Sequence, residues 1–230
     1  EDGQSIGLPS LVRRYPTYDE NVRLYMVMVA HEAGHLEFGT FELPIVRLQD
    51  LVEDLAQRYG RAVPNEARTL GNVFTRYPQP GLIRDLWALV EDARVEYLLR
   101  AEYPGLSRDL ASVAKDAVNV RSLAHGMTVR ELVVDQLLLF STTDAGTVIV
   151  PDAVKSEVDQ LWSHCRTIYH PRATAEEAVR LADRLYARMD ELLAVRREAI
   201  PSQDEAEAPE QSIPAPKSSE TVARPKKKAN

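Results

Sequence analysis

The sequence has few of the features that mark secreted, membrane-spanning or nucleic-acid-binding proteins. It contains one cysteine, Cys165, which excludes an internal disulfide framework and predicts a reducing compartment such as the cytoplasm. The apolar stretch ELVVDQLLLF is interrupted by Asp135 and Gln136 and is shorter than the roughly 20 residues of a membrane-spanning helix. The net charge of −7 and the pI near 5.4 argue against a nucleic-acid partner.

Strand signals are also nearly absent, whereas helix signals recur along most of the 230 residues. Capping boxes of the Thr-x-x-Glu type begin at Thr17, Thr128 and Thr174, and apolar residues follow them at helical spacing. The predicted helices cover about 18–38, 48–60, 80–100, 106–122, 128–141, 152–168 and 174–197. We therefore expect an all-α bundle of about seven helices that forms one domain over residues 1–199.

The composition changes at residue 200. The segment 200–230 has five prolines, no aromatic residue and charges of both signs. Such a segment cannot bury enough apolar surface to offset the entropy of ordering it, so we expect a disordered linker or tail. A linker usually leads to a further domain.

The clearest chemical motif is AHEAGH, which contains the His-Glu-x-x-His spacing of zinc hydrolases. Residues four apart lie on one face of a helix, so His31 and His35 can present two imidazoles to one ion. Glu32 lies beside this face and can act as general base toward a water on the metal. A further histidine six residues on, as in metzincins, is missing because position 41 is Phe41. The sequence therefore predicts a Zn²⁺ site that needs a third ligand from elsewhere.

The predicted helix around 80–100 offers candidates for that ligand. Glu91, Asp92 and Glu96 are acidic residues in an otherwise apolar helix, and a buried carboxylate is costly unless it is paired or coordinated. We take Glu91 as the third ligand, 56 residues after His35 as in glutamate-ligand zincins, and Asp92 as a residue that orients a histidine. An ordinary interhelical salt bridge is the alternative for each of these residues.

Two further residues in these helices carry expectations about packing. Glycine inside a helix costs about 1 kcal/mol relative to alanine, so Gly34 indicates close approach by a ligand or by a neighbouring helix. Arg94 is expected to form a salt bridge, with Glu32 or Glu37 as its partner.

Residues 5–105 resemble the N-terminal helical region of the NorD/CbbO-like proteins. The resemblance rests on SIGLPSLVRRYPTYDENVRLYMVMVAHEAGHLEFGTFEL and LWALVEDARVEYLLRAEYPGL, and most specifically on the combination of RLY, AHEAGH, EFGTF and EDARVE. These proteins carry a C-terminal von Willebrand factor A domain and work with MoxR-type AAA+ ATPases to remodel or activate a target protein. The Asp-x-Ser-x-Ser sequence of such a domain is missing here, so we expect it beyond residue 230.

The resemblance implies an interaction module that contacts a MoxR-type AAA+ ATPase and a target protein. In that interpretation His31, His35 and Glu91 form a structural or vestigial metal site. A helical scaffold without metal, in which the histidines are packed and hydrogen-bonded, stays open as an alternative.

The other interpretation is a zinc metallopeptidase in which Glu32 is the general base. This chemistry also needs a tyrosine or histidine to stabilise the oxyanion, and Tyr25, Tyr97 and His125 are the candidates. A peptidase cleft usually has an edge strand that aligns the peptide, and the sequence predicts none. The activator module is therefore the favoured interpretation, with the metallopeptidase as the alternative.

Overall fold

The computed structural model describes residues 5–60, 68–120, 127–142 and 148–199, in which all regular structure is helical. The predicted all-α fold class is thus confirmed. The α-helices are α1 (Tyr18–Glu37), α2 (Gln49–Tyr59), α3 (Leu70–Phe74), α4 (Pro80–Glu102), α5 (Ser107–Val120), α6 (Val129–Thr142), α7 (Lys155–Cys165) and α8 (Ala175–Ala199). Single 3₁₀ turns lie at Ile45–Leu48, Pro104–Leu106, Asp152–Val154 and Arg166–Ile168. The predicted tail at 200–230 lies outside the described residues.

Seven of the eight α-helices in the described residues correspond to the predicted ones, and local sequence explains several of their ends. The Thr17 hydroxyl accepts from the Glu20 backbone N–H, and the Glu20 carboxylate accepts from the Thr17 N–H. The same reciprocal bonds join Thr128 with Glu131 at α6 and Thr174 with Glu177 at α8. After α1, the chain turns at Gly39, whose φ of 70° is in the left-handed region that favours glycine.

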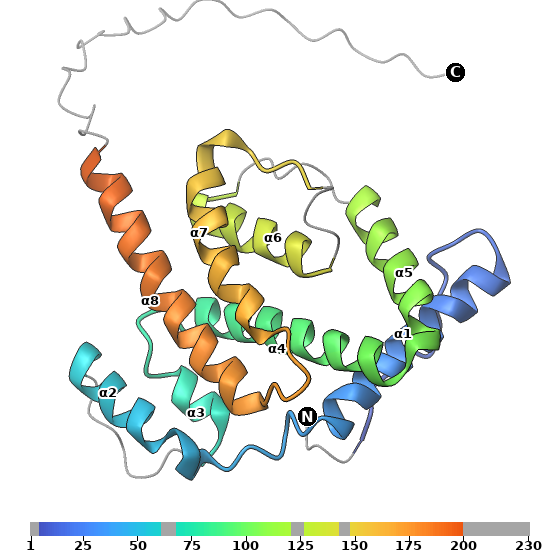
Figure 1. Cartoon of the computed structure of the whole chain (residues 1–230), viewed down its shortest axis with the longest axis horizontal. Coiled ribbons are helices and arrows are strands. Elements are labelled where there is room, and N and C mark those ends of the chain that lie inside the picture. The colour runs from blue at the N-terminus through green and yellow to red at the C-terminus, as the bar shows by residue number, and fades with distance from the viewer. Residues whose placement is uncertain (1–4, 61–67, 121–126, 143–147, 200–230) are drawn as a thin grey trace, which may run out of the picture.

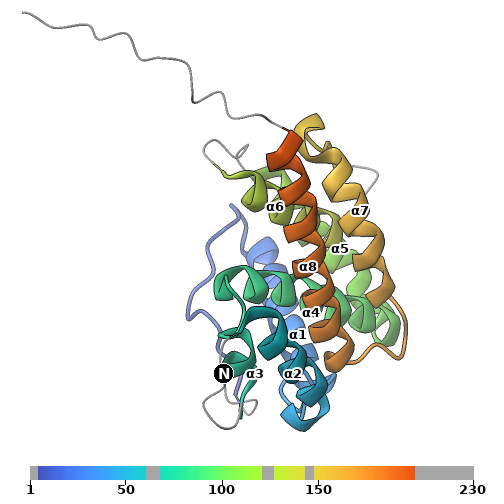
Figure 2. The same cartoon turned by 90° about the vertical axis from the view of Figure 1, so that its left-hand side faces the viewer.

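Helix α4 lies at the centre of the molecule (Figure 1). It packs along α8, and α1, α3 and α6 contact other parts of it. Figure 2 shows α8 crossing in front of α4 with α7 beside it. Because α4 is covered on several sides, ten of its 23 residues are buried, including two charged ones, Glu91 and Arg94.

The apolar core divides into two clusters that α4 joins. The larger cluster gathers α2, α3, α6, α7 and α8 around the first part of α4, with fully buried Ile83, Leu86 and Leu185 among its members. The smaller cluster consists of Val27 of α1, Val95 and Leu99 of α4 and Leu110 of α5. Helix α1 is therefore attached through the smaller cluster, toward the C-terminal half of α4. No helix in the described part of the chain has the length and apolarity to cross a membrane.

Candidate metal centre

The two histidines of the motif lie in the second half of α1, as the spacing predicts. The side chains of His31 and His35 are 22% and 12% exposed, and their Nε2 atoms are 3.1 Å apart. The rings meet edge to face, with centroids 4.8 Å apart and an interplanar angle of 82°. Two ring nitrogens this close require a proton or another cation between them, because two lone pairs would repel each other.

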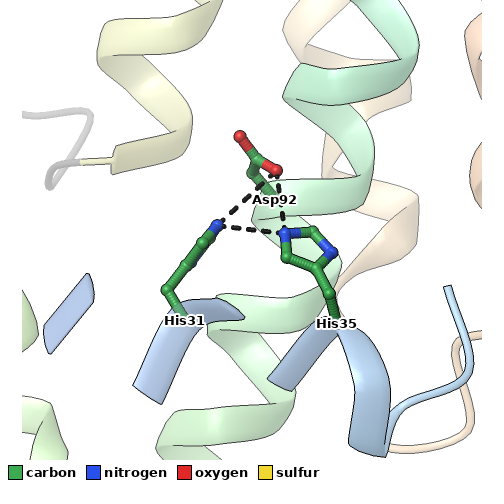
Figure 3. Close-up of side chains that lie close together, drawn as sticks. All are labelled: His31, His35 and Asp92. Carbon is green, nitrogen blue, oxygen red and sulfur yellow. Dashed lines mark hydrogen bonds and ion pairs between the residues drawn. The ribbon is translucent and has the colours of Figure 1, made fainter. Parts of the chain in front are cut away.

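The third side chain of the cluster is Asp92, which reaches the histidines from α4 (Figure 3). Its Oδ1 atom is 3.6 Å from Nε2 of His31 and 3.4 Å from Nε2 of His35. The three side chains each offer one ligand atom, and these atoms lie within 4.8 Å of one another. His31, His35 and Asp92 are therefore a group that can hold a metal ion.

Glu91, the residue taken from the sequence as third ligand, has its carboxylate engaged elsewhere. It is 1% exposed, and both of its oxygens accept hydrogen bonds from the guanidinium of Arg94, one of them at 2.9 Å. The two residues are three apart on α4 and so lie on one face, whereas Asp92 is turned by about 100° from Glu91. This turn brings Asp92 to the histidines, so the structure gathers two of the three predicted ligands and supplies a different carboxylate.

Arg94 forms the expected salt bridge, but its partner is Glu91 instead of Glu32 or Glu37. Its guanidinium also donates to the carbonyl of Phe38, after α1, and to the carbonyl of Ala173, before α8, both at 3.2 Å. This buried arginine therefore ties three segments of the chain together.

Glu91 is still connected to the candidate ligand His35, through Thr40. The Thr40 hydroxyl donates to the Glu91 carboxylate at 2.5 Å, because a carboxylate held by an arginine can only accept. Its oxygen lies 3.0 Å from Nδ1 of His35 and so accepts the proton of that nitrogen. The chain Glu91–Thr40–His35 thus fixes the tautomer that leaves the Nε2 lone pair of His35 facing the cluster.

Charge also favours a cation at this position. Burial by itself raises the pKa of Asp92, but its interactions with His31 and His35 outweigh burial and lower the pKa to about 2. Burial lowers the pKa of His31, but Asp92, Glu96 and Glu32 outweigh this and the pKa is raised. The site therefore holds a carboxylate anion at neutral pH and favours positive charge beside it.

A cavity of about 270 Å³ lies against the cluster. His31, Asp92 and Glu32 all contribute to its wall, together with Glu96. Glu96, the last of the three candidate carboxylates, accepts from Arg100 at 2.8 Å, and burial raises its pKa. Asp92 itself is 44% exposed, so the cluster is open on one side. The structure therefore places Glu32 and two of the three candidate ligands, His31 and Asp92, beside the same space.

Close packing between α1 and α4 explains Gly34. A Cβ atom at this position would lie 2.8 Å from Cγ1 of Val95 and 3.1 Å from Leu99. The glycine thus allows α1 to approach α4 closely enough for the histidines to reach Asp92. Of the two expectations for Gly34, packing against a neighbouring helix is the one that the geometry supports.

Of the candidate oxyanion partners, the structure describes Tyr25 and Tyr97. Tyr97 packs against Tyr169 with ring centroids 5.9 Å apart, and neither Tyr97 nor Tyr25 contributes to the wall of the cavity. His125 lies outside the described residues. Thr40 was missed by sequence reasoning, because a threonine just past a helix end has no spacing that would connect it with a carboxylate 51 residues away.

Fold and site together define an all-α domain with a two-histidine, one-carboxylate group that can hold a metal ion. No family model, curated protein or solved structure matches the chain in the three comparisons.

Proposed function

We propose that the group formed by His31, His35 and Asp92 binds Zn²⁺. Zinc ligands lie about 2.0–2.2 Å from the ion, so neighbouring ligands of a tetrahedral site are roughly 3.3–3.5 Å apart. The three distances between the ligand atoms are 3.1, 3.4 and 3.6 Å, close to these values. Two imidazoles and one carboxylate are also a donor set that zinc accepts in enzymes.

The function that this site supports best is hydrolysis of an amide or peptide bond, as in a zinc metallopeptidase. The observation that carries this proposal is that Glu32 and the ligands His31 and Asp92 line one cavity. Structural zinc sites are closed by four protein ligands, whereas catalytic sites have three and an open position. Zinc, when bound, supplies a Lewis acid that polarises the carbonyl of the substrate.

Glu32 has the role of general base and acid in this reaction. Its carboxylate takes a proton from the water whose oxygen attacks the carbonyl carbon. When the carbon–nitrogen bond breaks, Glu32 returns that proton to the amine that leaves. His31, His35 and Asp92 would hold the ion, and Thr40 keeps His35 in the tautomer that can do so.

The test is Glu32→Gln, with Glu37→Gln as matched control because Glu37 is an exposed glutamate of the same helix. Amide hydrolysis by the zinc-loaded chain is measured with fluorogenic peptides, and zinc content is measured in parallel. We expect Glu32→Gln to retain zinc and lose turnover by at least about 100-fold, the lower end of general-base contributions, while the control retains both. Equal turnover in the two variants would contradict a hydrolytic role for Glu32.

The second candidate is the interaction module that the sequence resemblance implies, acting with a MoxR-type AAA+ ATPase and a target protein. An apolar stripe on α1 favours it: Tyr18, Val22 and Met26 lie at successive helical turns and are 81%, 39% and 58% exposed. Apolar residues gathered in this way on a surface mark contact sites for other proteins. A cytoplasmic location, proposed from the single cysteine, suits both candidates.

This candidate is tested by measuring ATP hydrolysis of a MoxR-type ATPase with and without the chain. Met26→Asp is expected to abolish stimulation, and Glu32→Gln is expected to leave it unchanged. Stimulation that survives Met26→Asp would argue against the α1 stripe as the contact surface, and no stimulation by the unaltered chain would argue against the module.

A further inference from the structure

We propose that the cavity beside the metal centre is the specificity pocket of the hydrolase, and that it takes one apolar group about the size of a leucine or phenylalanine side chain. This inference rests on the proposed zinc-dependent function and adds the class of substrate. The substrates are short amides or peptides with such a group next to the bond that is hydrolysed.

The lining of the cavity supports an apolar occupant. Five of the seven residues that α1 and α5 contribute to its wall have aliphatic or thioether side chains, and Leu138 of α6 adds another. Those from α1 and α5 are Leu24, Val27, Met28, Leu110 and Val113. Apolar substrate surface that packs against this part of the wall is removed from water, which is favourable, and this part offers little to a charged group.

The two hydroxyl groups in the wall are already satisfied. Ser141 donates to the carbonyl of Leu138 at 2.9 Å, and Thr142 donates to the same carbonyl at 3.0 Å. Neither hydroxyl therefore needs a hydrogen-bond acceptor from a ligand on the α6 side of the cavity. The ionisable side chains in the wall come from α1 and α4, where the ligand group lies.

The volume sets the size of the occupant. A cavity of 150 Å³ binds benzene in another protein, so roughly ten carbon-sized atoms fit into a space of about 270 Å³. One large apolar side chain and part of the adjoining backbone fill such a space. A long polymer does not fit within it.

Binding of alkyl hydroxamates to the zinc-loaded chain tests this pocket without relying on turnover. A hydroxamate chelates zinc, so acetohydroxamate reports on the metal centre alone, and longer homologues add methylene groups for the cavity. Dissociation constants are measured by calorimetry for a series of increasing chain length, with the zinc-free chain as blank. We expect affinity to rise roughly fourfold per methylene until the cavity is full, and to stop rising beyond that length.

Two variants alter the cavity in opposite directions. Val113→Phe fills it and should shorten the optimal chain, whereas Met28→Ala enlarges it and should lengthen the optimum. Both should leave acetohydroxamate affinity unchanged. Val46→Phe is the matched control, because Val46 is 76% exposed and lies outside the cavity wall.

The outcomes separate this inference from the proposed function. If acetohydroxamate binds but affinity does not depend on chain length, the pocket assignment is overturned and the zinc site stands. If acetohydroxamate does not bind to the zinc-treated chain, the proposals of an open zinc site and of a specificity pocket are both contradicted. If Val113→Phe does not fold, the shift in Met28→Ala alone decides.

Discussion

Two neighbouring carboxylates on α4, Glu91 and Asp92, are expected to have different roles. The matched changes Asp92→Asn and Glu91→Gln distinguish a role in metal binding from a role in stability. Each change removes one negative charge and nearly preserves shape. Asp92 is 44% exposed and lies among ligand atoms, whereas Glu91 and Arg94 are each 1% exposed and paired with each other. The first change should therefore affect metal binding, and the second should mainly affect the fold.

The magnitudes follow from burial. Glu91→Gln leaves the Arg94 guanidinium buried without its counter-ion, which should lower the free energy of unfolding by about 3–5 kcal/mol, or Tm by roughly 6–20 °C. Its effect on zinc passes through Thr40 and should be a loss of about 10–100-fold in affinity. Asp92→Asn removes a ligand and should lose more than about 100-fold, while the metal-free chain loses less than about 1 kcal/mol.

Two measurements check this prediction: competition for zinc with a chromophoric chelator, and thermal unfolding in the presence of EDTA. If a folded Glu91→Gln chain loses zinc more completely than Asp92→Asn, Glu91 is the ligand and the assignment of Asp92 as the third ligand is wrong. If both variants bind zinc as the unaltered chain does, neither carboxylate is a ligand.

Four other predictions concern the ligands and the residues around them. Thr40→Val should weaken zinc binding by about 10–100-fold because His35 loses its tautomer control, and Thr40→Ser should restore most of it; chelator competition measures both. Gly34→Ala should lower the free energy of unfolding by about 1–3 kcal/mol, measured in urea, because the new Cβ meets Val95 at 2.8 Å; unchanged stability would contradict the close packing. In the metal-free chain, the raised pKa of His31 adds stability that is present below its ordinary value of 6.5 and is lost as pH rises through the folded-state pKa. The pKa of Asp92, lowered to about 2, adds stability that is present above its ordinary value of 3.8 and is lost as pH falls toward 2. The two contributions together should therefore be largest between about pH 4 and 6.5, which urea unfolding midpoints without metal would measure. Zinc affinity should rise with pH over the range in which the histidines lose their protons, because the metal competes with protons for the ring nitrogens. The stability contribution of His31 falls over the same range.

The helices could be predicted from sequence because their ends are encoded locally. Each capping box needs only two residues three apart, and all three that were predicted form. Helix α3 was missed because Leu70–Phe74 is little more than one turn, too short for an apolar period to show. Its Thr69–Asn72 capping box is the local signal that could have indicated it.

The candidate site could be predicted only in part. The pair His31 and His35 lies within one helix, so its geometry follows from helical spacing. The third side chain depends on which face of α4 meets α1, and α4 is buried on so many sides that its apolar pattern does not define a single face. Arg94 lies three residues after Glu91 on α4 and pairs with its carboxylate, so Asp92 is the carboxylate that lies beside the histidines.

The division of the core into two clusters has a consequence for how the molecule opens. Helix α1 is attached through a few apolar residues, whereas the first part of α4 is embedded in the larger cluster. Backbone amides of α1 should therefore exchange with solvent through a local opening that leaves the rest folded. An ion that joins α1 to Asp92 raises the free energy of this opening by its own binding free energy, so the supply of metal would govern how long the helix stays docked.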